Sequence, residues 1–189
     1  AERGSFTLAT DKALAKLKKF QLPDPTYFIL QWIQALVASG SQSIEVRYNH
    51  TGLRGEFELE LKFDGPGYSR AEIDGLYDHV FQSGRDRKQD RLRELALGWL
   101  SACSLPITQI ILESNQVRRS RKRGDNNGAE TTQTIEQPEG AVPLPLPNRL
   151  YVQGKGSYPF EKIITRHCTD VPCQLMYNKH LVSGIGGGG

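Results

Sequence analysis

The residue pattern with the clearest chemical meaning is a short glycine turn, Asp64-Gly65-Pro66-Gly67, which follows a run of alternating apolar residues. Two glycines around one residue let the backbone approach a bound group closely, because glycine lacks Cβ and adopts positive φ at little cost. A helix start just after such a turn offers backbone N–H groups to an anion. The turn therefore predicts a nucleotide site with Asp64, Gly65 and Gly67 as contacts. The alternative is that Asp64 caps the turn by accepting hydrogen bonds from backbone N–H groups.

A second candidate site is a basic cluster that places five cations in six positions. Charge runs of this kind usually belong to a solvated loop, which is one interpretation. The other is a contact with nucleic acid, with another anion or with a protein partner. The cations are Arg118, Arg119, Arg121, Lys122 and Arg123.

Composition narrows the class of protein. The 189 residues are 38% hydrophobic and 24% charged, which is typical of one soluble globular domain. No apolar run approaches the ~20 residues that span a bilayer, so we expect no membrane partner. The three cysteines, Cys103, Cys168 and Cys173, are not at zinc-ligand spacing, and they predict reduced thiols in a cytoplasmic protein. A net charge of +3 is too small to imply nucleic acid by itself.

The elements that must position these residues follow from periodicity. Apolar side chains three and four apart predict helices, and strict alternation predicts strands. We expect helices over residues 11–20, 26–39, 69–81, 90–103 and 159–168. We expect strands over residues 43–49, 56–63, 107–112, 150–153 and 173–177. Helices and hairpin strands in separate runs predict an α+β fold, a two-layer sandwich in which a mixed, mostly antiparallel sheet carries helices on one face.

Residues 1–182 are expected to form a single domain. Within it, residues 115–147 lack periodicity and become proline-rich, which predicts a long mobile insertion. Residues 183–189 are glycine-rich and predict a flexible tail, which is also suited to link further domains.

In this order the elements resemble the GHKL superfamily (the Bergerat fold) of gyrase B, histidine kinases, MutL and the ninety-kilodalton heat-shock chaperone. The N-terminal domain of the chaperone is the most similar. Five segments carry the resemblance, and Phe63-Asp64-Gly65-Pro66-Gly67 takes the place of the family's Asp-x-Gly-x-Gly turn. The others are the helix and strand over 28–46, Phe81-Gln82-Ser83-Gly84, the helix segment 97–102, and residues 160–175.

The resemblance also assigns roles, and the residues present do not fit them. The position of the family's catalytic carboxylate falls on Gln31, which has no carboxylate to accept a proton from water. The magnesium position falls on Ala35, which has no oxygen ligand to offer. The adenine-binding aspartate falls on Phe63, which accepts no hydrogen bond. Metal binding and efficient hydrolysis are therefore not expected.

The resemblance implies a catalytically degenerate, chaperone-like GHKL domain. Such a domain would act as a scaffold or as the regulatory head of a larger protein, with protein partners or further domains and no cofactor. One alternative is a divergent domain that still binds ATP or ADP, with weak hydrolysis at most, through the glycine turn, Ser83, Gly84 and Gly98. Another is a nucleic-acid or partner-binding module that uses the basic cluster.

Overall fold

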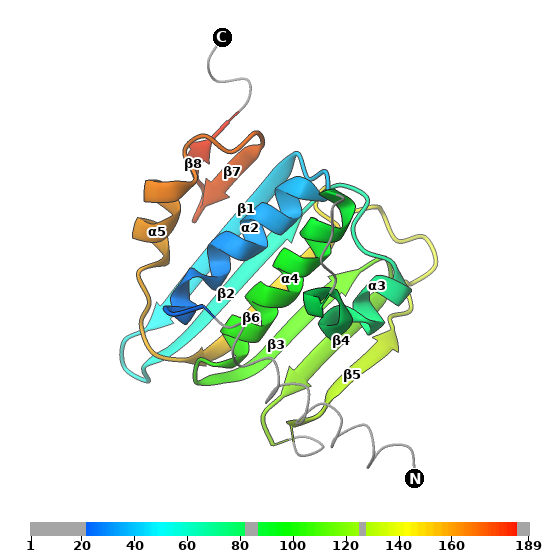
Figure 1. The fold of residues 1–189 in the computed structure, drawn as a ribbon, viewed down its shortest axis with the longest axis horizontal. Helices are drawn as coiled ribbons and strands as arrows, with labels where there is room; N and C mark the ends of the chain where they lie inside the picture. The colour runs from blue at the N-terminus through cyan, green and yellow to red at the C-terminus, as the bar shows by residue number, and fades with distance from the viewer. Residues whose placement is uncertain (1–21, 82–86, 125–127, 185–189) are drawn as a thin grey trace.

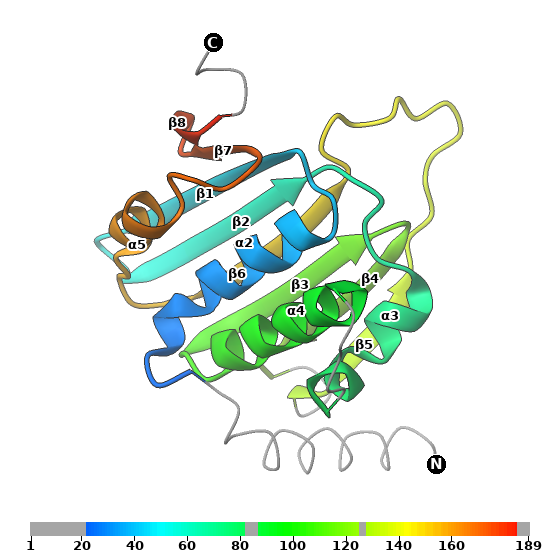
Figure 2. The same cartoon turned by 45° about the horizontal axis from the view of Figure 1, so that its top comes forward.

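A computed structural model describes residues 22–81, 87–124 and 128–184, and it confirms the α+β two-layer sandwich (Figure 1). One layer is an eight-stranded sheet, and the helices pack on one of its faces (Figure 2). The helix prediction over 11–20, the candidates Ser83 and Gly84, and residues 185–189 of the predicted tail lie outside the described residues. In the part of the chain that is described, no helix has both the length and the apolar character needed to cross a membrane.

The sheet has the strand order β5-β4-β3-β6-β2-β1-β7-β8. Strands β1 and β7 pair in parallel, and the other pairings between described strands are antiparallel. The strands are β1 (Ser43–Thr51), β2 (Glu56–Phe63), β3 (Ile107–Ser114), β4 (Val117–Lys122), β5 (Glu130–Thr134), β6 (Asn148–Lys155), β7 (Gln174–Tyr177) and β8 (His180–Ser183).

The helical layer is built around two helices that lie side by side over the central strands (Figure 2). These are α2 (Phe28–Ala38), which follows the 3-10 turn η2 (Pro25–Tyr27), and α4 (Arg87–Cys103). Three shorter elements flank them: α3 (Arg70–Asp74), the 3-10 turn η3 (Leu76–Phe81) and α5 (Phe160–His167).

Strand β2 shows why the sequence folds this way. Its alternate residues Phe57, Leu59, Leu61 and Phe63 are buried under the helices, and the charged residues between them face the other side. Helix α2 ends at Ala38, one residue before the predicted end, and Gly40 follows with a φ of +93° that suits glycine. The strand prediction for β2 is confirmed because its alternating apolar residues are the ones that the helices bury.

Two short elements differ from the prediction. The helix expected over 69–81 begins with a capping box at Ser69 and Glu72, but it ends at Asp74, and the chain continues as the 3-10 turn η3. Strand β8 was not predicted at all. It pairs with β7 through a tight turn in which Asn178 and Lys179 both adopt positive φ.

The largest difference lies in residues 115–147, which contain strands β4 and β5 where an irregular insertion was predicted. Strands β4 and β5 extend the sheet from β3, with Val117 paired to Ser114 and to Thr134. Local sequence did not show this because β4 carries arginines at alternate positions where apolar residues are expected. Residues 135–147 contain no helix or strand, as predicted.

A close contact between Gly98 and Trp32 sets the distance between α4 and α2. A Cβ atom built on Gly98 would lie 2.4 Å from Cδ1 of Trp32. The indole Nε1 also donates to the backbone oxygen of Leu95, at 3.3 Å. Gly98 therefore has a packing reason to be glycine, since the fully buried Trp32 ring lies directly on it.

We predict that Gly98→Ala lowers the free energy of unfolding by about 1–2 kcal/mol. Overpacking of a close-packed core costs about 1–3 kcal/mol, and the better helix propensity of alanine offsets about 1 kcal/mol at most. Chemical denaturation measures the loss. Gly52→Ala is the matched control, because a Cβ on Gly52 meets nothing within 4 Å. Equal stability of the two variants would contradict the packing role.

Candidate functional site

The glycine turn is closed by hydrogen bonds from the chain itself. Oδ1 of Asp64 accepts from the backbone N–H of Gln42, at 2.7 Å, and of Ser43, at 2.9 Å. The hydroxyl of Ser41 donates to the backbone oxygen of Asp64, at 2.9 Å. This geometry corresponds to the capping alternative, because the Asp64 carboxylate ties the end of β2 to the start of β1.

Both glycines of the turn are required by internal packing. Gly65 and Gly67 have φ of +92° and +68°. A Cβ on Gly65 would lie 3.1 Å from the backbone oxygen of Gly40, and a Cβ on Gly67 would lie 2.3 Å from Oγ of Ser114. The space that glycine leaves open for a ligand is therefore taken up by neighbouring parts of the fold.

A chain of buried hydrogen bonds links the turn to the middle of the sheet. The N–H of Tyr68 donates to Oγ of Ser114, at 2.9 Å, and that hydroxyl donates to Oδ1 of Asn148, at 2.7 Å. Nδ2 of Asn148 then donates to the backbone oxygen of Phe63, at 3.2 Å. Asn115, at the β3–β4 turn, donates to the backbone oxygens of Pro66 and Tyr68. The turn thus fastens β2 to β3 and β6.

Two fully buried rings occupy the space beneath the turn. Phe63 and Tyr68 pack edge to face, with centroids 6.2 Å apart. The hydroxyl of Tyr68 lies 2.9 Å from Oγ of Ser39, and the Arg91 guanidinium lies 5.5 Å from the Tyr68 ring centroid. Burial raises the pKa of Tyr68 to about 12, against which the hydrogen bond to Ser39 acts only partly.

The positions that the resemblance assigns to catalysis lie along α2. Gln31 is half-buried, and Ala35, one turn further on, is fully buried. The backbone oxygen of Ala35 accepts from the hydroxyl of Ser39, at 2.6 Å. The resemblance therefore places an amide, a methyl group and the Phe63 ring at the positions of the family's base, metal ligand and adenine acceptor.

A buried charged network, which sequence reasoning missed, joins β4 and β5 to the helices. Nε of Arg119 donates to Oε1 of Glu130 at 3.0 Å, and Nε1 of Trp99 donates to the same oxygen at 2.9 Å. The hydroxyl of Tyr77 donates to Oε2 of Glu130. Nη1 of Arg119 donates to the backbone oxygen of Ile73, at 2.9 Å.

The network raises the pKa of both Tyr77 and Arg119. Burial and the neighbouring Glu130 carboxylate raise the pKa of Tyr77 well above its ordinary value. Burial alone would lower the pKa of Arg119, but Glu130 beside it raises the pKa instead. The guanidinium also lies over the rings of Tyr77, at 4.9 Å, and Trp99, at 6.0 Å.

The basic cluster does not form one cationic surface. Arg119 is buried, whereas Arg118 pairs with Glu113 across the β3–β4 hairpin, at 2.8 Å. Arg121 and Arg123 line a cavity beside the end of α4, and Lys122 is exposed without lining it. Because β4 is a strand, successive cations point to opposite sides of the sheet.

Over the described ranges, no group of three or more His, Cys, Asp and Glu residues is placed to hold a metal ion. A scan against protein-family models finds no match for the chain, and a search of curated proteins finds none either. The GHKL resemblance therefore enters the functional argument as a proposal.

We predict that Arg119→Gln is strongly destabilising, because it leaves the Glu130 charge buried without its partner. Breaking a buried pair in this way costs about 3–5 kcal/mol, whereas loss of an exposed pair costs about 1 kcal/mol or less. Arg118→Gln is the matched control, one position away and at the surface. Urea denaturation of the two variants measures the difference. Arg119→Gln with the stability of Arg118→Gln would show that the network is not required.

The pKa of Tyr68 predicts a loss of stability in alkali. Its folded value of about 12 exceeds the ordinary value of 10.0, so the folded state holds this proton more tightly. The resulting stability is complete below pH 10 and is lost as the pH rises through 12. Between these values, Tyr68→Phe should reduce the fall in unfolding free energy by about 1.4 kcal/mol per pH unit. Identical pH slopes for the variant and the unmutated protein would contradict this.

Proposed function

We propose that this chain is a GHKL-type domain that no longer hydrolyses ATP and serves as a scaffold or as the regulatory head of a larger protein. The α+β sandwich and the order of its elements are consistent with such a domain. The residues at the family's catalytic positions argue against retained catalysis, since Gln31 has no carboxylate to act as a base and Ala35 has no oxygen ligand for magnesium.

The observation that carries the proposal is the closure of the glycine turn. Oδ1 of Asp64 already accepts two backbone N–H groups, and Gly65 and Gly67 pack against Gly40 and Ser114. A purine amino group would have to displace these contacts, and it would meet the buried Phe63 ring where an acceptor is needed. The turn therefore supports the fold rather than a nucleotide.

A protein partner is the second part of the proposal. Val142 and Leu144 are 83% and 69% exposed in a segment with proline at every second position from 143 to 147. Extended proline-rich segments are bound by other proteins at low entropic cost.

The cysteines Cys103, Cys168 and Cys173 are all free thiols, which suits a cytoplasmic protein.

We predict that ATP and ADP, with or without magnesium, produce neither heat of binding nor a thermal shift at millimolar concentration. Isothermal titration and differential scanning fluorimetry are the two measurements. Asp64→Ala should lower the melting temperature, because two backbone N–H groups lose their acceptor, and it should leave the nucleotide response at zero. Glu45→Ala, which removes an exposed carboxylate from β1, is the matched control.

The divergent-binder alternative gives the opposite pattern. It requires a saturable shift in the unmutated protein that Asp64→Ala abolishes and Glu45→Ala retains. Magnesium-dependent binding in the micromolar range would overturn the degenerate domain.

A further inference from the structure

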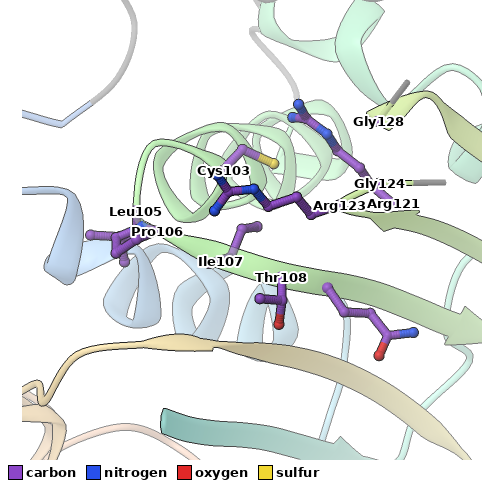
Figure 3. Close-up of a pocket in the computed structure, with 10 residues that line it drawn as sticks. Cys103, Leu105, Pro106, Ile107, Thr108, Arg121, Arg123, Gly124 and Gly128 are labelled. Atoms are coloured by element: carbon purple, nitrogen blue, oxygen red, sulfur yellow. The ribbon is translucent and has the colours of Figure 1, made fainter. Parts of the chain in front are cut away.

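A cavity of about 330 Å³ lies beside the end of α4, far from the glycine turn (Figure 3). Its lining comes from the link after α4, the start of β3, the end of β4 and the approach to β5. Ile107 pairs with Gly154, which in turn pairs with Phe57 near the start of β2. The glycine turn follows the opposite end of β2, so the two regions are separated by the length of the strand.

Two arginines give this cavity its charge. Arg121 and Arg123 are two residues apart on β4 and its extension, and their side chains point into the cavity with the thiol of Cys103 (Figure 3). Within the described ranges, neither guanidinium has a carboxylate oxygen within 4.0 Å, unlike Arg118, Arg119 and Arg149.

The carboxylate that faces Arg121 across the strands is hydrogen-bonded to other side chains. Glu130 stands directly across from Arg121 in the β4–β5 register. However, its two carboxylate oxygens accept from Arg119, Trp99 and Tyr77. The buried network therefore holds Glu130 away from the cavity and leaves the positive charge of Arg121 available to a ligand.

The other walls are neutral or apolar. Burial, reinforced by Glu130, raises the pKa of the Cys103 thiol to about 12, so the thiol adds no negative charge at neutral pH. The positive charge of Arg121 opposes this rise in the Cys103 pKa without cancelling it. Leu105, Pro106 and Ile107 supply an apolar side. The volume falls at the small end of the range for small-molecule sites.

We propose that this cavity binds a small phosphate monoester. The guanidinium groups of Arg121 and Arg123 would hold the phosphate, and the apolar side would hold the organic group. Planar guanidinium groups match phosphate oxygens in bidentate geometry, and each such contact is stronger than a neutral hydrogen bond. A dianionic ligand suits two cations that have no carboxylate partner among the described residues.

The test is titration of the whole chain with phenyl phosphate, inorganic phosphate and phenylacetate by calorimetry. Saturable binding of phenyl phosphate is expected, with weaker binding of inorganic phosphate and of the monoanionic carboxylate. Arg121→Gln and Arg123→Gln should each weaken the phenyl phosphate affinity at least tenfold. Lys122→Gln is the matched control, because it removes the same charge from the same strand without lining the cavity.

Differential scanning fluorimetry provides a second, independent measurement. Phenyl phosphate should raise the melting temperature of the unmutated protein and of Lys122→Gln, but not of Arg123→Gln, whose side chain is exposed. Circular dichroism checks that each variant is folded.

Three results would overturn the proposal. The first is the absence of saturable phenyl phosphate binding at millimolar concentration. The second is an equal loss of affinity in Lys122→Gln and Arg123→Gln, which would indicate attraction to surface charge in general. The third is binding of phenylacetate or inorganic phosphate as tight as that of phenyl phosphate. None of these measurements depends on the response to nucleotides.

Discussion

The turn that follows β2 is the constraint on which one end of the molecule depends. It must bring β1, β2, β3 and β6 together within a few residues, and it does so with one carboxylate and two glycines in positive φ. The Asp64 carboxylate accepts hydrogen bonds from two backbone N–H groups at the start of β1. Gly67 lets the backbone lie against Ser114 and Asn148, where any side chain would collide. A turn under such demands has little freedom left to receive a ligand.

The aromatic residues near the turn have packing roles. A phenyl ring at position 63 packs against Tyr68 in the core, and Trp32 lies directly on Gly98 between the two main helices. Aromatic side chains bury large apolar areas and stabilise a closed core. The region in which the resemblance expects a nucleotide thus contains buried aromatic side chains in close contact with the backbone.

The other end of the sheet is organised by the opposite kind of residue. Arg119 and Glu130 are buried charges, and such a pair is tolerated only when its geometry is good and its remaining groups find partners. Trp99, Tyr77 and the backbone oxygen of Ile73 provide those partners. Because Glu130 is engaged in this network, Arg119 supports the fold, whereas Arg121 on β4 and Arg123 just after it face a cavity.

The amino-acid sequence by itself determined the layers of this protein. The alternation in β2, the apolar faces of α2 and α4, the capping box at Ser69 and the glycine stop at position 40 are local signals, because each depends on residues a few positions apart. Only the tertiary structure decided the roles of the charged and polar residues. Whether Asp64 meets a ligand or a backbone, and whether Arg119 lies in solvent or in the core, depends on partners far away in the chain. A charged side chain is costly to bury without a partner, and the neighbouring sequence does not show which distant residue will be that partner.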